Sequence, residues 1–234
     1  MRTCYITFFA PIQPVSTYNL IELVTFAQRK PGLYTHLGLT VASPGGQMTY
    51  AFAAYGHIRQ SHFEIHTHAL GSVISAGVLL YCLGKKRSAT PLTNFQFHPV
   101  SLPVSNTVFE IPTLKEQLKR LETDQKNMIR ILAETTGKSE KEIENDVQNR
   151  IVLNAEAAKE YGLVTDIFDV PFVPTGAESH HIGEFMSPIH TLNPLATPAH
   201  HFNGFPPVME FPPQNQQQFA SSCFDYPPVG TVKN

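Results

Sequence analysis

Apolar and polar positions along the first 169 residues alternate between two periods, so strands and helices are expected in turn. Short apolar runs predict strands at 5–10, 36–42, 63–69, around 89, at 94–98 and at 164–168. Apolar positions that share a helical face predict helices at about 16–30, 47–59, 75–83 and 113–136, and two shorter ones from about 139 and 154. This alternation indicates one α/β domain with crossover helices.

Residue types that start and stop helices support these bounds. The expected N-caps and capping boxes are Ser16, Thr113 with Glu116, Ser139 with Glu142, and Asn154. Gly137 and Gly162 are expected to end helices. The long helix carries an apolar stripe that should pack against another surface, formed by Leu114, Leu118, Leu121, Met128 and Leu132.

The composition changes near residue 170, where the periodicity ends. Eleven of the 19 prolines follow that point, together with a glutamine-rich run at 214–218 and two histidine pairs. Repeated proline excludes regular helices and central strands. We therefore expect a folded domain at 1–169 and a Pro/His/Gln-rich tail at 170–234 that is disordered, with partner docking through its aromatic residues as the alternative.

Charge and cysteine content narrow the class of protein. The formal net charge of −2 provides no positive field for nucleic acid. Prolines break the apolar start of the chain, so neither a signal peptide nor a membrane span is expected. Three widely spaced cysteines do not form a disulfide framework. A soluble protein of the reducing cytoplasm fits these features.

Three segments are candidates for acyl-transfer chemistry, which needs a nucleophile, a base and backbone N–H groups for an oxyanion. Ser75 lies at a turn that enters an apolar helix, and a serine there can also be a simple cap. The turn at 43–46 has the sequence Ser-Pro-Gly-Gly, which lets the backbone approach a ligand or forms an ordinary tight turn. His98 ends an apolar strand and could act as a base or be a buried structural histidine.

Four segments together resemble the proteolytic subunit of the ATP-dependent Clp protease. They are Ser43-Pro44-Gly45-Gly46, Gly71 to Gly77 (GSVISAG), Phe97-His98-Pro99 and Ala155 to Val164 (AEAAKEYGLV). The resemblance covers most of residues 36–169. It implies a crotonase-like fold of stacked β-α-β turns with a protruding handle helix, here the helix from Thr113. It also implies ring-shaped homo- or hetero-oligomers that cleave peptides or unfolded proteins inside a chamber, fed by an ATP-dependent unfoldase.

The resemblance also assigns roles by position. Ser75 corresponds to the nucleophile, His98 to the general base, and the backbone N–H groups of Gly46 and Ala76 to the oxyanion hole. No cofactor is implied.

The position of the family's orienting Asp is Arg150 in this chain. Arginine accepts no hydrogen bond from an imidazole, and its charge disfavours the imidazolium of the transition state. Loss of the acid alone lowers the rate by roughly 10⁴ in other triads. Asn149 or Asp146 could replace the acid after a small shift, and the residues do not decide between them.

Other differences concern substrate binding and gating. Val73 and Ile74 replace small residues, and the segment Val100 to Val104 replaces a glycine-rich strand. The chain starts at about the first core strand, so altered gating by an unfoldase is expected.

Three functions follow. The first is a serine endopeptidase, and its alternative is a catalytically impaired structural subunit of a ring. The third, another crotonase-fold activity on an acyl thioester, is disfavoured by Ser75 with His98. No metal site is expected, because the spacing of His57, His62, His66 and His68 is not diagnostic.

Overall fold

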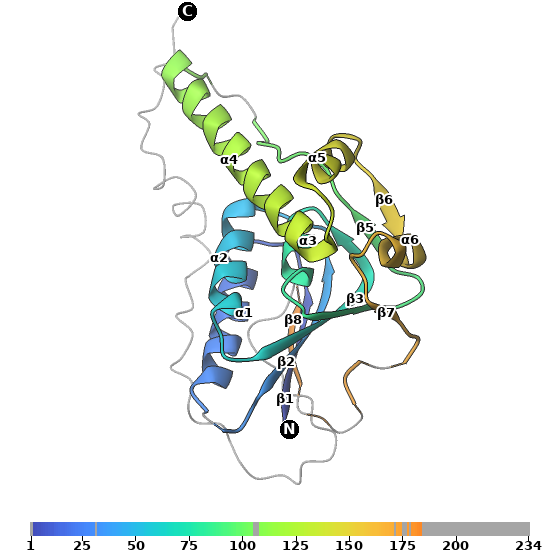
Figure 1. The fold of residues 1–234 in the computed structure, drawn as a ribbon. Helices are drawn as coiled ribbons and strands as arrows, with labels where there is room; N and C mark the ends of the chain where they lie inside the picture. The colour runs from blue at the N-terminus through green and yellow to red at the C-terminus, as the bar shows by residue number, and fades with distance from the viewer. Residues whose placement is uncertain are drawn as a thin grey trace, which may run out of the picture. The chain divides into compact units, whose positions relative to one another are not determined.

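The computed structural model describes residues 2–30, 32–104, 108–170, 172–174, 177 and 179–183 (Figure 1). The strands are β1 (Thr3–Phe9), β2 (His36–Ser43), β3 (Glu64–Ile74), β4 (Lys86–Ala89), β5 (Asn94–Gln96), β6 (Val152–Asn154), β7 (Asp166–Ile167) and β8 (Ser179–Gly183). The helices are α1 (Pro14–Gln28), α2 (Met48–Arg59), α3 (Ala76–Tyr81), α4 (Ile111–Thr136), α5 (Glu140–Gln148) and α6 (Ala155–Glu160). The predicted alternation of strands and helices is confirmed.

One mostly parallel sheet organises these elements. Its strand order is β6-β5-β3-β2-β1-β8, and β4 pairs with β3 and β7. All pairs are parallel except β5 with β6. The long strand β3 pairs with β4 through residues 66–69 and then with β5 through residues 72–74. The strand therefore joins the two parts of the sheet, and the α/β class with a crotonase-like arrangement is confirmed.

The core lies around β2 and the helices that follow the first three strands. Seven of the eight residues of β2 are buried, as expected for a parallel strand covered on both faces. In β1 buried residues alternate with partly exposed ones. Helix α1 packs against α2, and α2 against α3 (Figure 1). The shared face predicted for α1 is confirmed, because Leu20, Leu23, Val24 and Ala27 are all buried.

Strand β3 is longer than the sequence indicated. The apolar pattern predicts a strand at 63–69 followed by a turn, but β3 continues through Gly71 to Ile74. The continuation is possible because Gly71 adopts a φ of 64° and the last three residues hydrogen-bond to β5. As a result Ser75 directly follows a strand and precedes α3.

Helix starts were predicted with mixed success. The capping box of Ser139 with Glu142 and the N-cap Asn154 are confirmed, as is the left-handed Gly137 after α4. The Ser16 N-cap is wrong, because α1 begins at Pro14 and Ser16 is its third residue. The capping box of Thr113 with Glu116 is also wrong, because α4 begins at Ile111. In both helices a proline in the first two positions has a pre-set φ and needs no amide partner, so the helix starts earlier than the hydroxyl residue.

Helix α4 has two parts with different surroundings. Its C-terminal part is buried at Met128, Ile129, Ile131 and Leu132. In its N-terminal part Leu114 and Leu118 are 50% and 57% exposed, although they belong to the same predicted stripe. Figure 1 shows this part extending away from the sheet.

Strand β8 lies beyond the expected domain boundary. A tail without regular structure is expected from residue 170, but residues 179–183 pair in parallel with β1. The segment contains no proline, and Ile182 is buried in the core. The remainder of the expected tail, from 184 to 234, lies outside the described residues. No helix in the described part of the chain is long and apolar enough to cross a membrane.

Candidate active site

Ser75 occupies an unusual backbone conformation between β3 and α3. Its φ is 55° and its ψ is −126°. Its N–H donates to the carbonyl of Gln96 over 2.9 Å, which ties the junction to β5. A residue with a side chain in this region of φ and ψ costs about 1–3 kcal/mol and usually occurs where the surrounding structure requires it. The side chain makes no N-cap hydrogen bond to α3, so the simple helix cap is not the role the structure gives to Ser75.

The Ser43–Gly46 turn lies against the Ser75 junction. A Cβ built on Gly45 would be 2.8 Å from both the carbonyl oxygen of Ile74 and the Cβ of Ser75. A Cβ built on Gly77 would be 2.9 Å from the Cβ of Ser43. Real Cβ atoms essentially never come within 3.0 Å of a non-bonded carbon or oxygen atom. Both positions therefore require glycine, and the structure brings the turn and the serine into direct backbone contact.

Hydrogen bonds to Ile12 fix the direction of the Gly46 amide. The Ile12 N–H donates to the Gly45 carbonyl over 2.8 Å, and the Gln47 N–H donates to the Ile12 carbonyl over 3.0 Å. Ile12 and Gly46 thus form a parallel bridge, in which the carbonyl before Gly46 and the N–H after it both bond to Ile12. The N–H of Gly46 itself then points away from Ile12. The side away from Ile12 is the one on which β2 pairs with β3, up to Ser43 opposite Val73. The Gly46 N–H is therefore directed away from Ile12, toward the side on which β3 lies.

His98 lies two residues beyond β5, the strand that pairs with the end of β3. Ile74 is opposite Gln96 in this parallel pair, so Ser75 and His98 follow neighbouring strand ends. The side chain of His98 is half-buried. Among the described residues, no hydrogen bond joins its ring to Ser75. The structure thus places the two residues in the same region without the bond that proton transfer requires.

The ring of His98 is oriented by the backbone. Its Nδ1 lies 2.9 Å from the carbonyl oxygen of Pro99. A carbonyl oxygen can only accept, so Nδ1 carries a proton in this contact, and in the neutral tautomer with this contact Nε2 has the lone pair. This is the tautomer that a general base needs. Because any residue has a carbonyl, side-chain chemistry in the sequence gives no signal for this partner.

Arg150 lies between α5 and β6, next to the pair that β6 forms with β5. In the antiparallel pair of β5 and β6, Gln96 is opposite Val152, and the Phe97 N–H donates to the Ile151 carbonyl over 3.1 Å. Beyond this bond the next residues on the two segments are His98 and Arg150, whose N–H donates instead to the Val147 carbonyl over 3.1 Å. Arg150 is exposed, has a left-handed φ of 53°, and its guanidinium makes no hydrogen bond within the described part of the chain.

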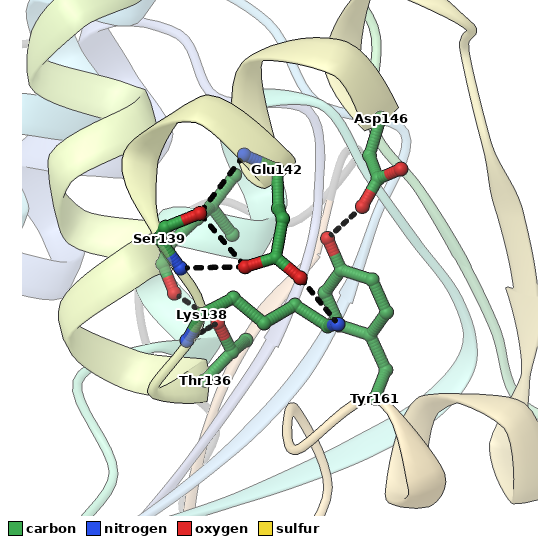
Figure 2. Close-up of polar contacts among 7 residues, drawn as sticks. Thr136, Lys138, Ser139, Glu142, Asp146 and Tyr161 are labelled. Atoms are coloured by element: carbon green, nitrogen blue, oxygen red, sulfur yellow. Dashed lines mark hydrogen bonds and ion pairs between the residues drawn. The ribbon is translucent and has the colours of Figure 1, made fainter.

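Neither of the two considered replacements for the acid is bonded to His98 among the described residues. Asp146 accepts a hydrogen bond of 2.6 Å from the Tyr161 hydroxyl (Figure 2). Burial and this carboxylate raise the pKa of Tyr161, so the hydroxyl remains a donor. Asn149 is the exposed C-cap residue of α5.

The same contacts fasten α5 to the rest of the domain. Lys138 lies 3.8 Å from a carboxylate oxygen of Glu142, and its ammonium is 4.7 Å from the centre of the Tyr161 ring (Figure 2). Tyr161 in turn reaches Asp146 on the next turn of the helix. This cluster of Lys138, Glu142, Asp146 and Tyr161 therefore holds the helix that leads into Arg150 and β6.

The remaining differences from the family pattern are also visible. Val73 is fully buried, and Ile74 is half-buried beside the Ser75 junction. The segment from Val100 to Val104 forms no strand, and its Leu102 and Val104 are exposed. One backbone bond ties it to α4, from the Val100 N–H to the Gln125 side chain over 3.3 Å.

Comparison with known proteins identifies relatives. The family model for Clp protease matches residues 4–171. ATP-dependent Clp protease proteolytic subunit 1 of Streptomyces avermitilis is 34% identical over 137 residues, which are 58% of this chain and 62% of that protein. Subunit 2 of Corynebacterium jeikeium is 35% identical over 132 residues, 55% of this chain and 62% of that protein. Subunit 2 of Chlamydia trachomatis is 33% identical over 157 residues, 66% and 75% of the two chains. The match to the first two relatives spans less than two thirds of their length.

Proposed function

This chain belongs to the Clp protease family, and on that premise we propose that it is a serine endopeptidase that cleaves peptides or unfolded proteins. The observation that carries the proposal is the conformation of Ser75. This residue has a positive φ, its side chain does not cap α3, and its backbone contacts the Ser43–Gly46 turn. A backbone conformation of this type costs about 1–3 kcal/mol, and residues that adopt it cluster at active sites.

In the proposed mechanism, Oγ of Ser75 attacks the scissile carbonyl carbon and transfers its proton to Nε2 of His98. The N–H groups of Gly46 and Ala76 stabilise the negative oxygen of the tetrahedral intermediate, a contribution of about 10²–10³ in rate for one donor elsewhere. The imidazolium then donates its proton to the departing amine, and a water molecule hydrolyses the acyl-enzyme with His98 as the base again. The mechanism requires a hydrogen bond between Oγ of Ser75 and Nε2 of His98, which is not among the bonds of the described residues.

The Pro99 carbonyl takes the place of the missing carboxylate in this mechanism. It accepts from Nδ1 and orients the ring, as an acid would. It carries no full charge, so it stabilises the imidazolium less than an Asp does. We therefore expect slow acylation, with a rate between that of a complete triad and that of a triad without any orienting group.

Assembly and partners extend the same proposal. The family implies a ring of identical or related subunits, and the exposed Ile111, Leu114 and Leu118 of α4 provide an apolar surface for contact between copies. Substrate delivery by an ATP-dependent unfoldase and a cytoplasmic location belong to this proposal.

A second candidate is a ring subunit without activity, which supports an active relative. Arg150, where the resemblance expects the orienting Asp, favours it, because a positive charge there opposes the imidazolium.

A fluorophosphonate probe separates the two candidates. The native assembly is treated with the probe, and adducts are located by mass spectrometry of the digested protein. The peptidase proposal expects one adduct at Ser75, none in Ser75→Ala, and at least a tenfold slower reaction in His98→Ala. Folded, assembled protein that forms no adduct would remove the peptidase and leave the inactive subunit. Native mass spectrometry, alone and with an active relative, then tests assembly, and a monomer in both samples contradicts the second candidate.

A further inference from the structure

Two neighbouring strands bring three metal-ligand side chains together at the end of the sheet opposite to Ser75. His36 is the first residue of β2, and Glu64 is the first residue of β3. The two are direct partners in the parallel register, and His66 follows two residues later on the same face of β3. One ligand atom from each of the three side chains lies within 4.8 Å of the others. They are the only group of three such ligands among the described residues.

The chemistry of this group suits a transition metal. Imidazole nitrogen and carboxylate oxygen are ligands of zinc and its neighbours, and two histidines with one glutamate form an established donor set. Nε2 of His66 and Oε1 of Glu64 are 3.0 Å apart, close to the spacing of two ligands on one tetrahedral ion. Glu64 accepts from His66 through one oxygen and lies 3.7 Å from Lys85 through the other, so both of its oxygens already face cationic or donor groups. A metal ion would replace the proton shared by His66 and Glu64.

Neighbouring groups orient the third ligand and leave space for a solvent molecule. Nδ1 of His36 lies 2.8 Å from Oγ1 of Thr35, which leaves Nε2 available for a metal. All three ligand residues are half-buried, so the fourth position can be filled by water. Lys85 is 3.7 Å from the second oxygen of Glu64, but its side chain is 76% exposed and can turn into solvent when a cation binds.

The next histidine on the same face does not belong to the group. His68 is stacked between Phe168 and Phe172 and bonds to Ser88 through Nδ1. The two rings that enclose His68 therefore limit the ligand set to His36, Glu64 and His66.

We propose that His36, Glu64 and His66 bind one divalent transition-metal ion of the Zn²⁺ class, with water as the fourth ligand. The site lies at the start of β2, whereas the Ser43–Gly46 turn follows its end, about 23 Å away at the rise of an extended strand. An ion there joins β2 to β3 and takes no part in the reaction at Ser75. The spacing of histidines in the sequence did not indicate this site, because His36 and Glu64 meet only through the strand register.

Metal titration of the full chain tests the proposal. Zn²⁺ is added in competition with a chromophoric chelator, and Co²⁺ is added to obtain the visible spectrum of the bound ion. Wild type and His62→Ala, an exposed histidine outside the group, should bind equally. His66→Ala and His36→Ala should each weaken the tightest site at least tenfold, and Glu64→Gln, which keeps the shape of the side chain, should weaken it as well. In Co²⁺, tetrahedral absorption should appear in wild type and be lost in His66→Ala.

Three results would overturn the proposal. Equal affinity of wild type, His36→Ala and His66→Ala would place the binding elsewhere, as would an equal loss in His62→Ala and His66→Ala. Unchanged binding in Glu64→Gln would remove the carboxylate from the site and with it the proposed ligand set. Circular dichroism of each variant confirms that the sheet is intact, and labelling of Ser75 should continue in all of them because the site is remote from it.

Discussion

The two halves of the candidate active site are held by different kinds of interaction. The nucleophile half, made of the Ser43–Gly46 turn and the Ser75 junction, is fixed by close backbone contacts at Gly45, Gly46 and Gly77. The base half, made of His98 and Arg150, is held by one carbonyl contact at Pro99 and by the strand register. The first half contains the glycines and the serine that the resemblance assigns to it, whereas the second has Arg150 where the resemblance expects an Asp.

The two halves differ in the free energy that a substitution would cost in each of them. A side chain at Gly45 or Gly77 would overlap neighbouring atoms, and the packed interior adjusts only at a cost of about 1–3 kcal/mol for each extra methylene. Position 150 is exposed, so an arginine there is accommodated without a clash. Packing therefore restricts the residues at the Ser75 junction, whereas nothing in the packing restricts the residue at position 150.

The largest effect is expected from Gly46→Ala, which acts on the nucleophile half. Its Cβ would overlap the carbonyl oxygen of Ile12, and its φ of 148° is rarely adopted by residues with side chains. Overpacking and backbone strain together should lower the free energy of unfolding by about 3 kcal/mol or more and remove labelling of Ser75. Urea unfolding and the fluorophosphonate adduct measure the two effects.

Gly71→Ala is the matched control for this change. Gly71 also has a positive φ, of 64°, but a Cβ there would meet no atom within 4 Å. Only the backbone cost of about 1–2 kcal/mol should appear, and labelling should continue. Equal effects of the two substitutions would mean that the contact with Ile12 does not hold the turn.

Restoring the acid with Arg150→Asp tests the base half. A carboxylate at this position would accept from Nδ1 of His98 and stabilise the imidazolium, whereas the present arginine opposes it. Labelling of Ser75 should become about 10–100-fold faster, equivalent to about 1.4–2.7 kcal/mol of barrier. Single-turnover labelling measured by intact mass gives the rate.

Arg150→Asn provides the comparison that isolates the negative charge. It removes the arginine, has the size of Asp and tolerates the left-handed φ of 53° at this position. We expect its labelling rate to lie between those of wild type and Arg150→Asp. If the Asp variant is no faster than the Asn variant, position 150 does not act on His98 through charge.

Sequence reasoning succeeded where the cause of a feature is local. Gly137 and the pair of Ser139 with Glu142 were predicted because a left-handed cap and a capping box depend on a few consecutive residues. Ser16 failed because Pro14 competes for the start of the same helix, a choice that residue preferences do not settle. Strand β8 was missed because its only partner, β1, is more than 160 residues earlier in the chain, at the other end of the described part.

In the candidate site, too, features that depend on consecutive residues were predicted and features that depend on the fold were not. The sequence indicated Ser75, His98, Gly46 and Ala76 through short motifs, and their roles remain predictions. The Pro99 carbonyl and the group of His36, Glu64 and His66 were not expected. A backbone acceptor depends on the local turn, and a cross-strand group depends on register. Neither a backbone acceptor nor a cross-strand group can therefore be recognised from the residue types along the sequence.

Tyr161→Phe should have a smaller effect, on the support of the base half. It removes the hydroxyl that donates to Asp146, while the ring remains beside Lys138. A hydrogen bond to a partly buried carboxylate contributes about 1–2 kcal/mol, so the free energy of unfolding should fall by that amount. Urea unfolding measures it, with Tyr18→Phe as an exposed control. A loss equal to that of Tyr18→Phe would show that this contact does not fasten α5.

The smallest effect on stability is expected from replacing Ser75 or Arg150 by glycine, because these two residues have side chains and a positive φ. Glycine adopts such angles without strain but is more flexible in the unfolded chain, so Arg150→Gly and Ser75→Gly should each gain only about 0.5–1 kcal/mol of stability. Their chemistry should differ: Ser75→Gly removes labelling, whereas Arg150→Gly keeps it or makes it faster by removing the charge of the arginine. A stability loss in Ser75→Gly would mean that the serine side chain stabilises the turn between β3 and α3. The nucleophile half would then be held by side-chain contacts as well as by backbone contacts.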